Sequence, residues 1–293
     1  MVSNPVREMG ASQSAIAQHY DVSNDFYRLW LDEHMTYTCA LWDDVNEAEA
    51  LEEAQRSKVD FYAKLVKAQG AKRVLDIGCG WGGALKRLVE AHGVESGIGL
   101  TLSPNQVSWM SEYSHPQVNV RLESWADHVP EAPYDAIISI GAFEHFARLG
   151  LSSQEKVSVY RSFFERCHEW LQLGGCLGLQ TIAYGNSGVK DFDEFIASEI
   201  FSESDLPRLA EIAQAIEYLF EIVILQNDRH HYARTLKTWL GRLKANRTEA
   251  VQVVEEEKVV VFERYLRLSS YIFQTGNCDL YLIGLRRIDQ PRR

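Results

Sequence analysis

Four residues in one short stretch of this sequence have the types and the spacing of a ligand-binding loop. The apolar run V-L-D-I contains Asp76, and glycines follow at every second position, Gly78, Gly80 and Gly82. Glycine permits backbone torsions and close approaches that a Cβ atom would forbid. A helical pattern over 84–92 follows at once, so the stretch predicts a strand, a tight turn and a helix N-terminus that cradle a nucleotide-like ligand. We expect Asp76 to order that turn; the alternative is an acid that merely ends a strand.

A carboxylate and an imidazole, Glu144 and His145, directly follow a second apolar run, Y-D-A-I-I-S-I-G-A-F. Side chains at the carboxyl ends of strands carry function in open α/β sheets. Beside Phe143 and Phe146, this pair predicts a partly dry active site that could stabilise a cation or move a proton. The alternative is an exposed pair on the surface.

The stretch G-I-G-L-T-L-S-P-N-Q (97–106) ends a further predicted strand with polar groups but no acid. Many nucleotide-binding folds place an acid here to hold the ribose hydroxyls. Thr101 and Gln106 are available in its place and could bind ribose or the amino-acid end of a ligand. Trp125, after the next strand, could stack on adenine or belong to the core. Together the three motifs predict a site for S-adenosylmethionine (SAM).

The elements that must position these residues alternate between strands and helices. The expected strands are 73–77, 96–100, 118–122, 135–140, 176–182, 221–226 and 279–286, and the helices among them are 84–92, 104–113 and 155–171. Such alternation requires crossover connections and a mostly parallel sheet. The sequence therefore predicts an α/β fold, Rossmann-like as in class I SAM-dependent methyltransferases, with a mostly parallel seven-stranded sheet.

Further helical segments predict a cap over the carboxyl ends of the strands, where ligands of open α/β sheets bind. Helical patterns cover four segments, 11–33, 47–69, 191–220 and 232–272. We assign to the cap the N-terminal helices in 11–69 and an insertion at 184–220, whereas 232–272 connects the last two strands. No linker divides the chain, so we expect one domain over 1–293.

Charge and hydropathy narrow the class of protein. Lys and Arg number 30 against 41 Asp and Glu, which gives a net charge of −11. This balance argues against nucleic acid as a partner and allows at most peripheral contact with an anionic membrane. No stretch approaches the roughly 20 apolar residues of a membrane span. The first ten residues lack the apolar core of a signal peptide.

Cysteines and histidines give no sign of a metal site. The five cysteines are scattered and never in C-x-x-C spacing, so we expect neither disulfides nor structural zinc. A reducing, cytoplasmic environment is the corresponding expectation. His230 and His231 lack cysteines or acids at ligand spacing, and no metal is assigned. The oligomeric state stays open, and a homodimer is one arrangement consistent with the sequence.

With these residues placed, the sequence resembles the cyclopropane fatty acid synthase family, especially the mycolic acid cyclopropane synthases and their methyltransferase relatives. The resemblance runs from about His19 to the C-terminus. It rests on Q-H-Y-D-V-S-N-D-F-Y, M-T-Y-T-C-A-L-W, V-L-D-I-G-C-G-W-G, G-L-T-L-S-P-N-Q, I-S-I-G-A-F-E-H-F and H-Y-A-R-T-L-K-T-W. It implies methyl transfer from SAM to an unactivated alkene, after which a bound bicarbonate removes a proton from the carbocation and a ring closes.

The resemblance also implies which residues bind each ligand. The SAM-binding positions are Tyr37, Thr38, the loop 74–82 with Trp81, and then Thr101, Leu102, Gln106 and Trp125. The bicarbonate site corresponds to Cys39, Glu144, the backbone at Ile182, and Tyr232.

Three departures from the family pattern concern ring closure. Where the family reads H-T-I, this chain reads Gln180-Thr181-Ile182, and glutamine can donate a hydrogen bond but cannot shuttle a proton near neutral pH. The segment between Ile182 and Ile200 looks shorter than in the mycolate enzymes. Ser269 stands where the family has a cysteine. These changes are compatible with methyl transfer and weaken the expectation of a cyclopropane product.

The sequence therefore predicts a SAM-dependent methyltransferase. It would act on an electron-rich alkene carbon of an apolar, lipid-like or secondary-metabolite substrate, free or carried by a protein, with C-methylation or cyclopropanation as outcome. One alternative is N-methylation of a small amine, with Glu144 and His145 orienting or deprotonating the amine. The other is a SAM-binding protein without catalytic activity.

Overall fold

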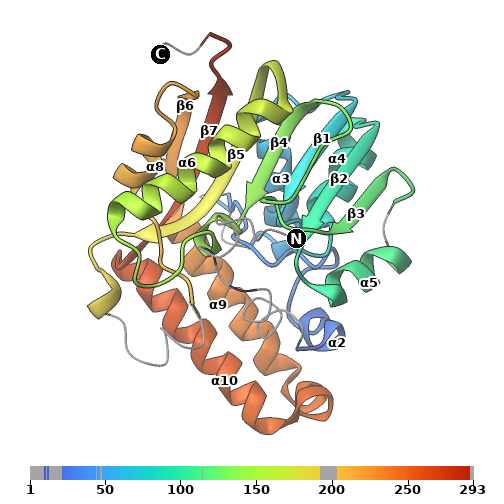
Figure 1. Cartoon of the computed structure of the whole chain (residues 1–293). Coiled ribbons are helices and arrows are strands. Elements are labelled where there is room, and N and C mark those ends of the chain that lie inside the picture. The colour runs from blue at the N-terminus through green and yellow to red at the C-terminus, as the bar shows by residue number, and fades with distance from the viewer. Residues whose placement is uncertain are drawn as a thin grey trace.

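A seven-stranded sheet forms the centre of the computed structural model, which describes Gly10, Ser12 and residues 22–43, 45–46, 48–113, 115–191 and 203–290 (Figure 1). The strands are β1 (Arg73–Ile77), β2 (Ser96–Thr101), β3 (Val118–Leu122), β4 (Tyr134–Ile140), β5 (Leu171–Tyr184), β6 (Phe220–Asn227) and β7 (Cys278–Arg287). Their order is β3-β2-β1-β4-β5-β7-β6, and only β7 runs antiparallel to its neighbours. The predicted α/β fold with a mostly parallel seven-stranded sheet is confirmed.

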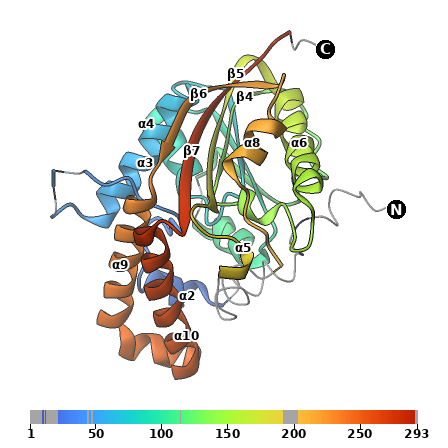
Figure 2. The same cartoon turned by 90° about the vertical axis from the view of Figure 1, so that its left-hand side faces the viewer.

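Helices cover both faces of this sheet, which is why its central strands are continuous apolar runs. Figure 2 shows α3 (Leu51–Leu65) and α4 (Gly83–His92) on one face, and α6 (Ser153–Trp170) and α8 (Leu209–Ala215) on the other. Helix α5 (Pro104–Tyr113) packs beside β2 and β3. The carboxyl ends of the parallel strands are left at one edge, and the loops that follow them meet there.

A helical hairpin extends beyond that edge. It consists of α9 (Arg229–Ala245) and α10 (Arg247–Thr275), which lie side by side in both views (Figures 1 and 2). Helix α10 packs against α2 (Asn24–Arg28), and Phe26 of α2 meets Phe262 of α10 at 4.9 Å between ring centres. The sequence predicted helix here but treated it as a connection. The structure adds this hairpin to the elements at the ligand-binding end of the sheet.

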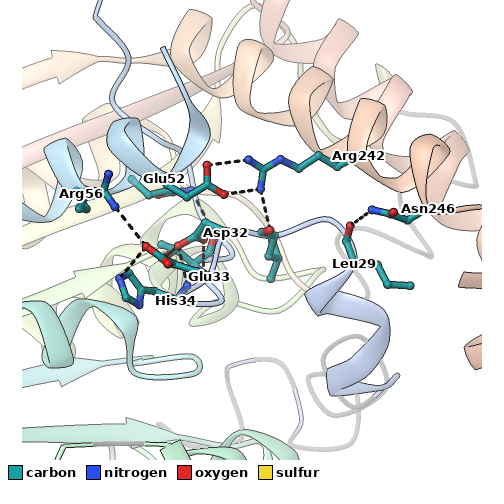
Figure 3. A network of polar contacts seen from close by, with 11 residues as sticks. Leu29, Asp32, Glu33, His34, Glu52, Arg56, Arg242 and Asn246 are labelled. Carbon is teal, nitrogen blue, oxygen red and sulfur yellow. Dashed lines mark hydrogen bonds and ion pairs between the residues drawn. The ribbon is translucent and has the colours of Figure 1, made fainter. Parts of the chain in front are cut away.

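Polar contacts fix the hairpin to the N-terminal part of the chain (Figure 3). Arg242 in α9 forms an ion pair with Glu52 in α3 at 2.8 Å and donates to the Leu31 carbonyl at 3.0 Å. Asn246, between the two helices, donates to the Leu29 carbonyl at 2.7 Å. The segment that follows α2 is therefore held between α3 and the hairpin.

Within the described residues, the helix expected over 11–33 is only the short helix α2. Residues 11 and 13–21 lie outside the described residues, and α2 ends at Arg28. Beyond it, the Asp32 carboxylate accepts hydrogen bonds from the backbone N–H groups of His34 and Thr36, at 3.1 and 2.7 Å. An acidic side chain that bonds to nearby backbone in this way stabilises a turn instead of a helix.

The described part of the 184–220 insertion packs mainly against α6. Residues 192–202 lie outside the described residues, and the helical parts on either side are the short η3 (Val189–Asp191) and α8. Buried Lys156 of α6 donates to the Leu206 carbonyl at 2.6 Å and pairs with Asp205 and Glu211 at 3.3 and 3.2 Å. These contacts place α8 on the opposite face of the sheet from α3 (Figure 2).

Candidate active site

The glycine loop after β1 has the predicted form of a strand, a tight turn and a helix N-terminus. Gly78, Gly80 and Gly82 have φ angles of 83°, 55° and 81°, a region that L-residues rarely adopt. A Cβ atom on Gly78 would overlap the side chain of Ala142, and one on Gly82 would overlap Met110. At Gly80, in contrast, a Cβ would meet nothing within 4 Å. The loop therefore needs glycine at each position and leaves room beside Gly80 for a ligand.

Asp76 is buried in β1, two residues before the first glycine of this loop. Burial raises the pKa of its carboxyl to about 7, and the positive charge of Lys58 acts in the opposite direction. Its Oδ1 atom has no hydrogen-bond partner among the described residues. An orphaned buried acceptor beside a glycine cradle at a helix N-terminus fits a ligand such as SAM, which carries hydrogen-bond donors.

Polar groups after β2 are already bonded to one another. Thr101 Oγ1 donates to Gln106 Oε1 at 2.5 Å, and both side chains are buried. Leu102, between them, is half-buried. The structure thus brings the three predicted SAM-binding residues of this motif together at the end of the strand next to the glycine loop.

Trp125 lies within the apolar core. Its ring packs 5.2 Å from that of Phe146 and 5.4 Å from that of Phe163, and 9% of the residue is exposed. The sequence left an adenine platform and a core residue open as roles for this side chain. The packing shows the core role, and contact with adenine stays a prediction.

An extended segment carries Tyr37, Thr38 and Cys39 across the same edge of the sheet. Gln55 in α3 holds it by donating to the backbone carbonyls of Thr36 and Thr38, at 3.3 and 2.8 Å. Cys39 Sγ contacts the Ala40 carbonyl at 3.1 Å, and burial raises the pKa of this thiol well above its usual value. Cys39 is therefore a neutral thiol that can donate a hydrogen bond. We call residues 36–39 the strap.

Glu144 lies in the short helix η2 (Phe143–His145), directly after β4. Its carboxyl is buried and accepts hydrogen bonds from the Thr181 hydroxyl, at 3.4 Å, and from the backbone of Ile182. Burial is the largest effect and raises its pKa to about 7. Glu144 can therefore either accept or release a proton near neutral pH, as the expected role requires.

His145 points to a different set of contacts. Its Nδ1 shares a hydrogen bond of 2.8 Å with the Ser204 hydroxyl, from the insertion. Burial lowers the pKa of the imidazole to about 4, so the ring is neutral near pH 7. The hydrogen bond with Ser204 holds the insertion against η2. A direct role of His145 in proton transfer stays a prediction.

Gln180, the residue that replaces a family histidine, joins the strap to the sheet. Its Nε2 donates to Thr38 Oγ1 at 2.5 Å. Its backbone carbonyl accepts from Gly141 N at 3.0 Å, in the turn that leads to Glu144. The Gln180 amide thus positions Thr38. It lies close to the predicted site residues Thr38 and Glu144.

Aromatic side chains from the hairpin and α2 enclose this region. Tyr37 lies near the centre of the group, with ring centres at 5.4 Å from Tyr27, 5.4 Å from Trp30 and 5.2 Å from Trp239. Trp81 of the glycine loop joins it at 4.9 Å from Tyr27. These pairs are tilted or edge-to-face, and aromatic groups of this kind give an apolar surface that can stabilise a nearby positive charge.

Two further phenols come from the hairpin. Tyr232 is buried in the first turn of α9, with its ring 4.6 Å from that of Phe273. Tyr265 of α10 accepts a hydrogen bond from the Tyr37 hydroxyl at 3.0 Å, and it interacts electrostatically with Glu144. Burial raises the pKa of Tyr265 to about 12, so its hydroxyl keeps its proton.

Sequence reasoning missed Tyr265 and Lys58. Tyr265 lies in a long amphipathic stretch, and no residue pattern there indicates which face of the helix lines a site. For Lys58 a signal was present, because it shares one face of α3 with Ala54 and Tyr62, which are both buried. A lysine on the apolar face of a helix should have indicated a buried charge.

The described residues give no sign of a metal site or of a membrane-spanning helix. No three of their His, Cys, Asp or Glu side chains group as metal ligands would. None of their helices is long and apolar enough to cross a bilayer.

Known proteins resemble this chain in both sequence and structure. The family model described as mycolic acid cyclopropane synthetase matches residues 8–283. Cyclopropane mycolic acid synthase 3 of Mycobacterium tuberculosis is 32% identical over 293 residues, which cover 94% of each chain. The S-adenosylmethionine-dependent methyltransferase UmaA of the same species is 36% identical over 277 residues, 88% of this chain and 91% of the relative.

Solved structures give the same result. The cyclopropane synthase MmaA2 of M. tuberculosis superposes with a TM-score of 0.83 at 32% identity, covering 95% of this chain and 99% of the other. The mycolic acid cyclopropane synthase CmaA1 in complex with SAH and CTAB gives a TM-score of 0.84 at 30% identity, covering 96% and 100%. Coclaurine N-methyltransferase, at 21% identity and a TM-score of 0.79, shares the fold. With a glycine loop that fits SAM and these matches over nearly its full length, the chain belongs to the mycolic acid cyclopropane synthetase family of SAM-dependent methyltransferases.

Proposed function

We propose that this enzyme transfers the methyl group of SAM to an alkene carbon of an apolar, chain-like acceptor in the cytoplasm. The observation that carries the proposal is the buried Glu144 carboxyl beside an aromatic enclosure. Bound SAM supplies an electrophilic methyl group. The names of the relatives, which refer to cyclopropane mycolic acids, support a lipid-like acceptor. The five free cysteines are consistent with a reducing compartment.

Glu144 is the residue to which we assign proton removal. Attack by an alkene leaves positive charge on the acceptor, and an anionic carboxylate near it lowers the energy of that charge. A carboxyl with a pKa of about 7 is ionised in a large fraction of molecules at neutral pH and still basic enough to take a proton. Its bonds from Thr181 and the Ile182 backbone hold it in one orientation.

The aromatic groups have a matching role. Tyr37, Trp30 and Trp239 present faces that exclude water and attract positive charge. The Tyr37–Tyr265 hydrogen bond fixes one phenol of this enclosure relative to the hairpin. An unactivated alkene needs such a dry surface, because a carbocation formed near water would be captured by it.

Gln180 leads us to propose a methylated product without a ring. Ring closure requires a proton to leave the transferred methyl group itself. A glutamine cannot carry that proton, and its amide here is bonded to Thr38. Glu144 would then remove a proton from the carbon chain of the acceptor, which leaves a methylated alkene.

Bicarbonate belongs to the proposal only as an auxiliary base. The groups that would hold it are the neutral Cys39 thiol, the Tyr232 hydroxyl and the Ile182 backbone. Glu144 could join them when protonated, since a carboxylic acid donates a hydrogen bond to an anion. Turnover in CO2-depleted buffer tests this part: a bicarbonate-dependent enzyme loses activity and regains it when bicarbonate is added back.

The class of acceptor is tested with methyl-labelled SAM and matched acceptors. The panel contains an unsaturated fatty acid, the saturated acid of equal length, both acids bound to a carrier protein, and a small aromatic amine. We expect label in the unsaturated acceptors and none in the saturated ones. Label in the amine alone would establish N-methylation instead. A protein that binds SAH and labels none of a broad set of alkenes and amines would be a SAM-binding protein without catalytic activity.

A further inference from the structure

Three buried side chains, two on α3 and one in β1, each hold a polar atom that lacks both solvent and a polar partner among the described residues. The atoms are Lys58 Nζ, Asp76 Oδ1 and Gln55 Oε1. Their residues are 2%, 3% and 2% exposed. A buried ammonium and a buried carboxylate are costly unless they are compensated, so such a group calls for a function or a bound partner.

The position of Lys58 on α3 places it between the strap and the sheet. One turn before it, Gln55 donates to the Thr36 and Thr38 carbonyls of the strap. One turn after it, the Tyr62 hydroxyl donates to the Leu179 carbonyl of β5, at 3.4 Å. Residues three and four apart share a helix face, so the Lys58 ammonium lies on the face of α3 that joins these two elements.

The charged and titratable groups around Lys58 come from two parts of the chain. Asp32 and Cys39 flank it from the N-terminal segment, and Asp76 from β1. The Asp32 carboxylate is already occupied by the backbone of His34 and Thr36. Cys79 of the glycine loop is the other titratable group near Asp76. The positive charge of Lys58 is therefore available to balance the negative charge of the Asp76 carboxylate.

We propose that Lys58 is a positioning residue for the methyl donor, which keeps Asp76 as a carboxylate beneath the glycine loop and couples that loop to the strap. The proposal rests on SAM binding by this family member and not on the identity of the acceptor. Burial raises the pKa of Asp76 to about 7 although the Lys58 charge acts in the opposite direction, so loss of that charge raises the pKa further and leaves the carboxyl mostly protonated at neutral pH.

The test is calorimetric binding of SAH to the full chain between about pH 6 and pH 9. For Lys58→Met we expect affinity for SAH to fall about tenfold or more at pH 7, and to recover toward pH 9 as Asp76 ionises. The midpoint of this pH profile should therefore lie at higher pH than in the wild type. Lys58→Arg keeps the charge and should remain within about threefold of the wild type.

A second buried lysine gives a matched control. Lys156→Met removes an equally buried charge from the other face of the sheet, where it contacts Asp205 and Glu211. It should lower the melting temperature and leave SAH affinity unchanged. Asp76→Asn combined with Lys58→Met should lose the recovery of SAH affinity toward pH 9, because Asp76 is no longer there to ionise.

The outcome that overturns the proposal is a Lys58→Met protein that binds SAH as the wild type does, or loses affinity equally at every pH. Should Lys58→Met fail to fold, Lys58→Gln keeps a polar side chain without the charge and gives the same readout. Because SAH binding needs no acceptor, failure here is distinguishable from failure of the proposed alkene chemistry.

Discussion

The two halves of the active site are built in different ways. The donor half consists of the glycine loop after β1 and the turn after β2, each a continuous run of sequence. The acceptor half combines Glu144 after β4, Gln180 of β5, and Tyr232 and Tyr265 of the hairpin, and the strap, with its predicted SAM-binding residues Tyr37 and Thr38, connects the two halves. The donor half is mostly backbone, whereas the acceptor half is mostly side chains.

This difference has a functional consequence. Backbone conformation at Gly78, Gly80 and Gly82 determines whether the donor can bind, and this requirement is the same for any methyl acceptor. We propose that the side chains of the other half decide which acceptor reacts and where the proton goes. A single side chain there can change the product without changing donor binding. The predictions below test whether the two halves can be separated in this way.

Glu144→Gln should separate them most strongly. The amide keeps the size and the hydrogen bonding of the carboxyl but cannot accept a proton. We expect kcat to fall by about 10²- to 10⁴-fold, with the affinity for SAH within about twofold of the wild type. Rapid-quench assays of methyl transfer and calorimetry of SAH on one preparation measure both quantities. Unchanged turnover would remove Glu144 from the mechanism.

Gly80→Ala should act on the donor half alone, and Gly93 provides its control. Both glycines have positive φ angles, 55° and 66°, and a Cβ at either would meet nothing within 4 Å. Both alanine variants should therefore lose about 1 kcal/mol of stability. Only Gly80→Ala should also weaken SAH binding, by at least about tenfold, because its Cβ would occupy the space beside the cradle. Equal SAH affinities in the two variants would place the ligand elsewhere.

The pH dependence of stability reports on the buried carboxyl of the acceptor half. Burial raises the pKa of Glu144 from 4.5 to about 7, so the folded protein retains a proton that the unfolded chain releases. Between these values the free energy of unfolding falls as pH rises, by on the order of 2 kcal/mol for this group. Chemical denaturation at about pH 5 and pH 8 measures the change. Glu144→Gln should reduce that change, and an identical change in both proteins would show that Glu144 keeps an ordinary pKa.

Tyr265→Phe should have the smallest effect. It removes the hydrogen bond with Tyr37 but keeps the ring in place. We expect kcat/KM for the acceptor to fall by about three- to tenfold, because one buried hydrogen bond is worth about 1 kcal/mol. Tyr271→Phe, on the exposed surface of the same helix, is the matched control. Equal values in the two variants would exclude a positioning role for Tyr265.

The same contrast explains how much could be predicted from the sequence. Strands β1 and β3 begin and end where expected, because each is a short apolar or alternating run bounded by turn residues. The glycine loop was equally visible, since its function depends on residues that are adjacent in sequence. Local patterns were sufficient for the donor half.

The acceptor half depended on contacts between distant segments. The α9–α10 hairpin was predicted as helix, but an amphipathic pattern does not say which partner its apolar face meets. Its position beyond the carboxyl edge of the sheet comes from long-range contacts such as Arg242 with Glu52 and Asn246 with Leu29 (Figure 3). Tyr265 could not be assigned to the site before that placement was known. For the same reason, the bond between Gln180 and Thr38 could not be anticipated.

The most direct test of the account counts deuterium in the product formed with SAM that carries a fully deuterated methyl group. The account predicts three deuteriums in the product of the wild-type enzyme, because a proton is lost from the acceptor chain and no ring closes. Gln180→His, which restores an imidazole at this position, should give some product with two. Two deuteriums in the wild-type product would contradict the account, since they would show that the methyl group loses a proton although Gln180 stands in place of the histidine.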